Sequence, residues 1–195
     1  MKFTSDFEKS SFIERCAWKN FIKLYNPFDG WYVDITPYEG KTIYDVCLFK
    51  QVDGLITKRI FIEIKVRDNH WDDGLFLETK KYNSIKNLCD KELYLKEDEY
   101  KIWYLNFTPK GTFLWDCNIT KELKSDKQVM NKATMSSRSE KENKSKWNMP
   151  IERAKTWNYI WDESQLRPHY DEYFNKKVKQ NIRGKGGLED ILFMK

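Results

Sequence analysis

The sequence has only two histidines and four cysteines in 195 residues, and it contains no long apolar run. His70 and His169 lie far apart in polar surroundings, which argues against a catalytic Ser/His or Cys/His centre. No run approaches the ~20 apolar residues of a membrane span, and the charged opening segment lacks the apolar stretch of a secretion signal. We therefore expect no membrane contact and a cytoplasmic location.

The cysteines stand singly, at Cys16, Cys47, Cys89 and Cys117, and none has the spacing of a zinc site. Each lies among apolar neighbours. This pattern predicts reduced core residues rather than disulfides.

Aromatic residues are abundant, with 8 Trp, 11 Tyr and 12 Phe. Each ring can bury roughly 150–250 Å², so the chain has enough apolar surface for one compact domain, with or without tails. Wholesale disorder and a fibrous chain are excluded.

The net charge of +5 is unevenly distributed. Residues 175–187 carry five cations and no acid: Lys176, Lys177, Lys179, Arg183 and Lys185. Residues 120–149 are polar and poor in large apolar side chains, which predicts a mobile excursion or a marginal helix. We expect a core over 1–119, a segment over 150–174 that packs on it, and a basic tail with a short apolar end over 175–195.

Hydrophobic periodicity predicts an α/β fold in the order α-β-β-β-α-β-β, followed by a C-terminal extension. Thr4 or Ser5 can cap the first helix, which runs to about Tyr25. The expected strands cover 31–36, 42–51 and 55–66, then 100–107 and 112–117 after a helix over 77–92.

Charged residues interrupt two of these apolar strands. Asp45 lies within the run Ile43–Phe49, and Glu63 and Lys65 lie within Ile60–Val66. The two-residue period of a strand puts Glu63 and Lys65 on one face. A buried carboxylate needs a partner, so these groups are candidates for a shared site.

Whether Asp45 joins them depends on the hairpin register. A two-residue Asp53–Gly54 loop would pair Asp45 with Ile62 and send it to the opposite face from Glu63. A three-residue loop over 52–54, with Gly54 in the left-handed region, would pair Asp45 with Phe61 and place all three charges on one face. We predict the three-residue loop.

Asp45 followed by Glu63-Ile64-Lys65 resembles the signature of the PD-(D/E)XK nucleases. This restriction-endonuclease-like superfamily includes archaeal Holliday junction resolvases and many phage recombination nucleases. The resemblance covers about Glu8 to Cys117, with Tyr44 in place of the name-giving proline. It implies a mixed β-sheet flanked by helices.

The resemblance also implies a metal site. Asp45, Glu63 and the carbonyl of Ile64 would bind Mg²⁺, with Mn²⁺ as a substitute, and Lys65 would orient or help deprotonate the attacking water. A glutamate on the first helix completes the site in similar nucleases. Glu14 is the candidate here, and Glu8 is the alternative.

Nucleic-acid contacts are expected at the second helix and the tail. Lys81 would contact a phosphate, and Glu78 and Tyr82 would support the site. The basic tail would neutralise phosphates, and His70 or Trp71 would lie at the rim. Residues 187–193 resemble the short peptides that dock replication proteins on sliding clamps.

Each of these residues also has an ordinary structural interpretation. Glu63 and Lys65 could form a surface ion pair, and the lysines near Lys81 could be a solvated helix face. The basic tail could serve solubility alone, and the terminal peptide could simply pack on the domain.

We expect a Mg²⁺-dependent deoxyribonuclease, an endonuclease of recombination, repair or phage DNA processing, with DNA favoured over RNA. The resemblance implies a homodimer. An RNA-directed or toxin-like nuclease would use the same site. The alternative from another class is a non-catalytic nucleic-acid-binding or interaction protein on the same fold. It predicts carboxylates that lie apart or are ion-paired to lysines, and binding that is indifferent to Mg²⁺.

Overall fold

A computed structural model of the chain describes residues 3, 5–36, 42–67, 75–131, 141–170 and 172–174. The chain divides into two compact units. Phe3–Trp161 forms the larger unit, and Asp162–Lys195 with the first two residues forms the smaller one. The described part of the smaller unit includes the short 3-10 helix η4 (Glu163–Leu166), which Asp162 caps.

A six-stranded mixed sheet is the centre of the larger unit, in the order β1-β2-β3-β5-β6-β9. Its strands β3 and β5 pair in parallel, and all other neighbours are antiparallel. The strands are β1 (Tyr32–Ile35), β2 (Val46–Val52), β3 (Leu55–Val66), β5 (Tyr100–Thr108), β6 (Gly111–Asp116) and β9 (Lys155–Trp157).

The first helix, α1 (Asp6–Tyr25), begins where the sequence predicts. Ser5 is its N-cap and accepts a hydrogen bond from the Glu8 N–H at 3.1 Å, which satisfies one of the free donors of the first turn. The helix ends at Asn26, whose left-handed backbone closes the last turn. The apolar residues at its centre, among them Cys16, Ala17 and Phe21, are buried, whereas Phe7 and Leu24 at its ends are exposed.

A smaller sheet in the order β4-β8-β7 was not expected from the sequence. Strand β4 (Leu75–Glu78) occupies the start of the predicted second helix, so α2 (Thr79–Asn87) begins two residues later than expected. A π-helical turn, η1 (Leu88–Glu92), then completes the expected helical stretch.

In the polar stretch over 120–149, the described residues form two strands after the end of a 3-10 helix and no α-helix, contrary to the marginal-helix interpretation. After the 3-10 helix η2 (Cys117–Glu122), β7 (Asp126–Asn131) and β8 (Lys141–Met149) form an antiparallel pair, and β8 also pairs with β4. The pairing supplies backbone hydrogen bonds that compensate for the few apolar side chains. A second 3-10 helix, η3 (Ile151–Arg153), leads to β9.

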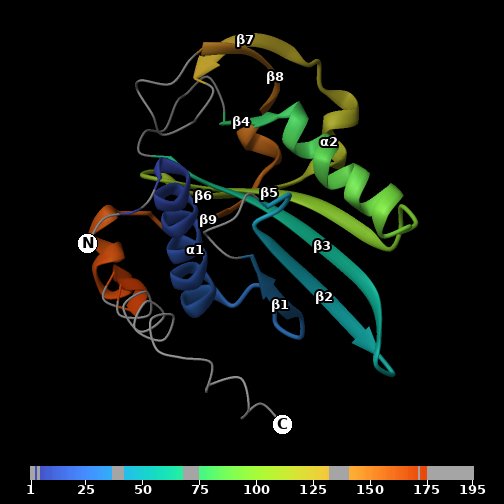
Figure 1. Cartoon of the computed structure of the whole chain (residues 1–195), viewed down its shortest axis with the longest axis horizontal. Coiled ribbons are helices and arrows are strands. Elements are labelled where there is room, and N and C mark those ends of the chain that lie inside the picture. Colours follow the sequence, from blue (N-terminus) through green and yellow to red (C-terminus); the bar gives the residue numbers. More distant parts are fainter. Residues whose placement is uncertain are drawn as a thin grey trace, which may run out of the picture. The chain divides into compact units, whose positions relative to one another are not determined.

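Opposite faces of the main sheet are covered by different elements (Figure 1). Phe21 of α1 packs edge-on against Phe107 of β5. The other face of β5 carries Tyr104, which shares a core cluster with Ile85 of α2 and Leu77 of β4. Because alternate residues of a strand face opposite sides, α1 covers one face, and α2 with the small sheet covers the other.

The β2–β3 hairpin differs from the predicted one in its loop. Val52 pairs with Leu55, so the loop is the two-residue Asp53–Gly54 turn, in which both residues have positive φ. A bulge between this turn and the site shifts the register, so that Cys47 pairs with Phe61. Continued by two residues, this register sets Asp45 across from Glu63. The predicted pairing of Asp45 with Phe61 is therefore wrong.

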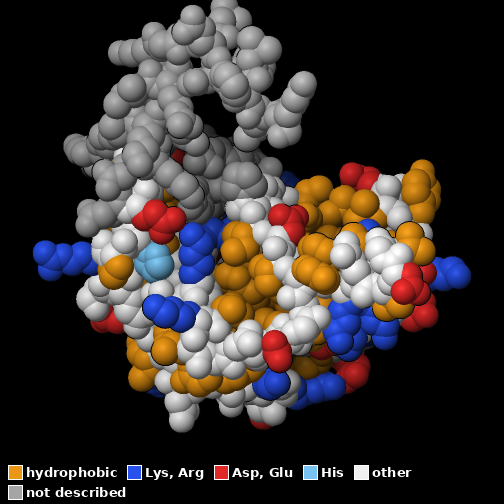
Figure 2. Space-filling model, turned by 90° about the horizontal axis from the view of Figure 1, so that it is seen from below, with side chains coloured by type: hydrophobic (Ala, Val, Ile, Leu, Met, Phe, Trp, Pro, Cys, Tyr) orange, Lys and Arg blue, Asp and Glu red, His pale blue; other side chains and the backbone are white. Residues whose placement is uncertain are grey.

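The four cysteines are free and buried, as predicted. Exposed apolar side chains include Tyr32 and Val33 on β1, a terminal strand of the sheet, and Val52 and Leu55 at the hairpin end. Figure 2 shows hydrophobic side chains among charged ones on the face seen from below. A terminal strand is the kind of element that can pair with another chain, but the homodimer stays a prediction. No helix in the described ranges combines the length and apolarity of a membrane span.

Candidate active site

Four of the predicted site residues meet at one end of β3. Glu63 and Lys65 lie on β3, Asp45 directly precedes β2, and Glu14 comes from α1. All three carboxylates are buried, with residue exposures of 6% for Glu14, 5% for Asp45 and 3% for Glu63. Such burial of three acids requires cations nearby.

Lys65 supplies the central cation. Its Nζ lies 3.0 Å from Glu14 Oε1, 2.8 Å from Glu63 Oε1 and 3.0 Å from the carbonyl oxygen of Ile64. Three oxygens from two elements therefore surround one ammonium. Glu14, rather than the alternative Glu8, is the glutamate of α1 that bonds to Lys65.

Asp45 is held by two different donors. Arg15 Nη2 lies 2.9 Å from Asp45 Oδ1, and the Ile64 N–H donates to Oδ2 at 2.7 Å. Arg15 is almost completely buried and also donates to the Thr36 hydroxyl at 2.7 Å. The Asp45 carboxylate is thus fixed against β3. No sequence pattern pointed to Arg15, although it stands directly beside Glu14 on α1.

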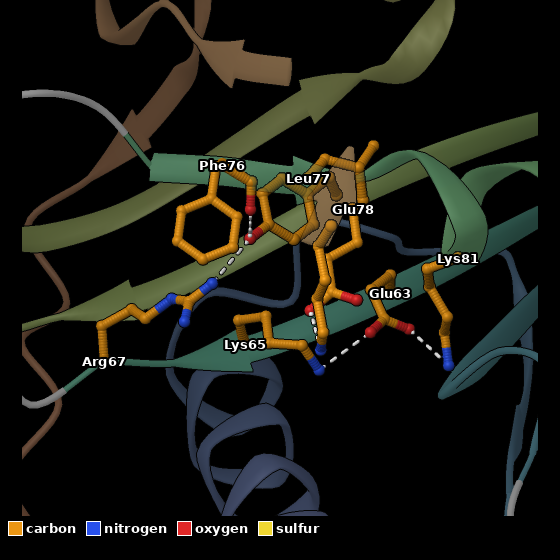
Figure 3. A pocket seen from close by; sticks show the side chains of 9 residues that line it. Glu63, Lys65, Arg67, Phe76, Leu77, Glu78 and Lys81 are labelled. Carbon is orange, nitrogen blue, oxygen red and sulfur yellow. Dashed lines mark hydrogen bonds and ion pairs between the residues drawn. The ribbon is translucent and has the colours of Figure 1, made fainter. Parts of the chain in front are cut away.

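Glu63 lies between two lysines (Figure 3). Its Oε1 contacts Lys65, and its Oε2 lies 2.9 Å from Nζ of Lys81 on α2. This buried Oε2 accepts no hydrogen bond from any described residue, so its contact with Lys81 is an ion pair only. Lys81 also donates to the Thr42 carbonyl at 3.2 Å, which ties α2 to the segment before β2.

The cluster shifts the pKa values of its members in different directions. Burial raises the pKa of Glu14 to about 7, and Asp45 and Glu63 add to this rise although Lys65 opposes it. Burial and the nearby Asp45 also raise the pKa of Glu63. Burial opposes ionisation of Asp45, yet Arg15 and the lysines lower its pKa to about 2. Burial disfavours the ammonium of Lys65, but the three acids hold its pKa well above the usual value.

The donor set fits a hard divalent cation. Within the described residues, no group of three or more His, Cys, Asp or Glu side chains is arranged as a ready metal site. However, the three oxygens around Lys65 Nζ are carboxylate and carbonyl oxygens, the ligands that Mg²⁺ prefers, and they already surround a cation. Asp45 can join this set only by sharing its oxygens, because Arg15 and Ile64 engage both.

A cavity of about 210 Å³ opens beside the cluster. It is lined by Glu63, Lys65, Arg67, Phe76, Leu77, Glu78, Lys81, Tyr104 and Lys144. Four of these residues were not predicted from the sequence: Arg67, Phe76, Tyr104 and Lys144. Arg67 continues the alternation of Glu63 and Lys65 and could have been found, whereas no local signal connects Lys144 with this site.

The remaining predicted residues have mixed outcomes. Glu78 lines the cavity and pairs with Lys144 at 3.1 Å. Tyr82 packs edge-on against Trp147 and is not among the lining residues, so its ring contributes to the core instead. The other predicted contacts lie outside the described residues: His70, Trp71, Lys176, Lys177, Lys179, Arg183, Lys185 and the peptide 187–193.

Comparisons with protein-family models and with curated proteins found no match to this chain.

Proposed function

We propose that this chain is a divalent-cation-dependent nuclease that hydrolyses phosphodiester bonds of nucleic acid, with DNA as the favoured substrate. The observation that carries the proposal is the convergence of Glu14, Glu63 and the Ile64 carbonyl on one cation. Asp45 lies against the same backbone, held by the Ile64 N–H. A mixed sheet with helices on both faces is compatible with the restriction-endonuclease-like fold that the resemblance implies.

In this proposal Glu14, Glu63 and the Ile64 carbonyl hold Mg²⁺, and Asp45 shares an oxygen with it. Bound there, the ion would polarise a phosphate and lower the pKa of a bound water. Lys65 would orient or help deprotonate the attacking water and would offset negative charge on the phosphate.

Lys81 would assist from the opposite side of Glu63. Its Nζ lies 2.9 Å from Glu63 Oε2 and lines the cavity. A Glu63 carboxylate that binds a divalent cation attracts Lys81 less strongly. Lys81 would then be available to a substrate phosphate, as predicted from its place at the start of the second helix.

The test is cleavage of end-labelled linear, flapped, four-way-junction and single-stranded DNA and RNA, with Mg²⁺ or EDTA. We expect metal-dependent cutting by the wild type and a loss of at least about a hundredfold in Glu63→Ala and Lys65→Ala. Lys58→Ala is the matched control, because Lys58 is an exposed lysine on the same strand. Cutting that survives Glu63→Ala would contradict the proposed site.

One observation favours a non-catalytic nucleic-acid-binding protein as the second candidate. All three carboxylates are ion-paired with basic side chains, Glu14 and Glu63 with lysines and Asp45 with Arg15. Paired carboxylates are what the binding interpretation predicts. A wild type that binds the same panel equally well in Mg²⁺ and in EDTA, and never cuts it, would establish this candidate and refute the nuclease.

A further inference from the structure

We propose that the cavity beside the acidic cluster binds the phosphate of an unpaired nucleotide, with Lys144 and Arg67 as its anion ligands. The proposal rests on the nuclease function and adds a substrate class to it. The substrate would be a nucleic-acid strand that is unpaired next to the bond that is cut.

The size of the cavity limits what can enter. Its volume of about 210 Å³ gives room for a phosphate group with part of its sugar. In a duplex the sugar is held by its paired and stacked base, so entry of the sugar with its phosphate costs unstacking energy, whereas an unpaired nucleotide enters without that cost.

The cavity lining carries four cations, Lys65, Arg67, Lys81 and Lys144, and two carboxylates, Glu63 and Glu78. Two further acids pair with these cations, Glu14 at 3.0 Å from Lys65 and Glu142 at 3.6 Å from Lys144, so the charges balance. A phosphate would therefore be held by hydrogen-bond donors at short range rather than by a net positive charge.

Lys144 reaches the cavity from β8 and is well placed to bind a phosphate. Its side chain is only 11% exposed, and its Nζ lies 3.1 Å from Glu78 Oε1 and 3.6 Å from Glu142 Oε1. An ammonium has three donors, so Lys144 can keep both contacts and still donate to a phosphate. Glu78 then serves to hold the ammonium at the cavity wall.

Arg67 is held in a fixed orientation in the cavity lining (Figure 3). Its guanidinium carbon lies 4.7 Å from the centre of the Phe76 ring, and Nη2 lies 3.2 Å from the Tyr104 hydroxyl. That hydroxyl in turn donates to the Phe76 carbonyl. A guanidinium fixed by a ring and a hydroxyl loses little freedom on binding a phosphate, and its planar fork matches the phosphate oxygens.

The cavity and the acidic cluster share three residues, Glu63, Lys65 and Lys81. A strand that presents one phosphate to the cluster therefore presents a neighbouring phosphate to the cavity. Because the cavity and the acidic cluster share these residues, we assign the bound nucleotide to the substrate strand rather than to a separate ligand.

The test measures binding without metal, so it does not depend on cleavage. Fluorescence anisotropy in EDTA compares a short labelled single strand with the same sequence as a blunt duplex. We expect the single strand to bind about tenfold more tightly, and Lys144→Gln to lose about tenfold in affinity with a salt slope smaller by about one. Lys144→Arg should retain binding, because it keeps the charge.

Lys146→Gln is the matched control. Lys146 lies two residues further along β8, on the same face, with its Nζ 4.9 Å from the centre of the Phe76 ring, but it does not line the cavity. We expect less than about a twofold loss for this variant. An equal loss in both variants, or a duplex that binds as tightly as the single strand, would overturn the proposal.

Inorganic phosphate distinguishes a general anion site from a strand site. If phosphate alone displaces the strand at low concentration and the duplex competes equally well, the assignment to an unpaired strand is wrong. A chain that prefers single strands through Lys144 but never cuts them would refute the nuclease and support the cavity assignment. The two proposals can therefore fail separately.

Discussion

Replacement of Lys65 by methionine tests the centre of the site directly. The substitution keeps an unbranched side chain of similar length and removes the ammonium that contacts Glu14, Glu63 and the Ile64 carbonyl. Two buried carboxylates then lose their closest cation. We expect a folded but less stable protein whose stability depends more strongly on pH and on divalent cations.

The size of the expected loss of stability follows from the burial of Glu14 and Glu63. Removing one member of a buried ion pair costs roughly 3–5 kcal/mol. The Lys65 side chain is 24% exposed, and Glu14 can take up a proton, so we expect a loss of about 2–3 kcal/mol near neutral pH. For a chain of this size the loss lowers Tm by roughly 5–10 °C. At about pH 5 the deficit should shrink, because protonated Glu14 no longer needs the ammonium.

Although the Lys65→Met protein should be less stable, it should bind a divalent cation more tightly than the wild type. In the wild type a divalent cation must displace Lys65 Nζ from the three oxygens that it contacts. The variant has no ammonium to displace, so its Kd for Mn²⁺ should fall by about tenfold, equivalent to about 1.4 kcal/mol. Isothermal titration calorimetry without nucleic acid measures this, and the rise of Tm in Mn²⁺ should be larger in the variant than in the wild type.

Lys58→Met is the control, since Lys58 is an exposed lysine on the same strand. This variant should shift Tm by no more than about 2 °C and should leave the Kd for Mn²⁺ unchanged. A Lys65→Met protein that is as stable as the wild type, with unchanged affinity for Mn²⁺, would show that Lys65 does not occupy the cation position.

Two further predictions concern the buried charges of α1. Because folding raises the pKa of Glu14 from 4.5 to about 7, the folded protein binds more protons in this window, and Glu14 should cost about 3 kcal/mol of stability as pH rises through it. Glu14→Gln should reduce this dependence of stability on pH, measured by thermal unfolding at several pH values. An unchanged dependence would assign it to other groups. Arg15→Met should cost about 3–5 kcal/mol in urea unfolding, because it leaves the buried Asp45 carboxylate without its cation. Adding Asp45→Asn should recover part of that loss, and strict additivity of the two substitutions would contradict the pairing.

Local sequence was sufficient to predict the elements that carry the site. The Ser5 cap and the apolar periodicity predicted α1, and the two-residue period of β3 predicted that Glu63 and Lys65 share a face. These features depend on neighbours within a few residues along the chain. The candidate site could be predicted because a charged residue inside an apolar strand is visible in the local sequence.

The register of the β2–β3 hairpin could not be predicted from residues that are close along the chain. The turn is the two-residue loop that, without a bulge, would have separated Asp45 from Glu63. An additional residue at Thr57 restores the shared face, and its hydroxyl contacts the Lys50 carbonyl at 3.5 Å. The bulge allows Val46 and Ile62 to pair and to be buried. Packing across the sheet therefore decided the register.

What the sequence by itself determined is the chemistry of β3 and its acid–lysine pair. Only the tertiary structure decided which partners surround it. Arg15 and Asp45 form an ion pair although they are 30 residues apart in the sequence. Lys144 and Glu78 are 66 residues apart, and they meet because β8 pairs with β4, a pairing that no local pattern predicted. Contacts between such distant residues depend on how whole elements bury their apolar faces, so the cavity and its cations arise only when the sheets and helices pack together.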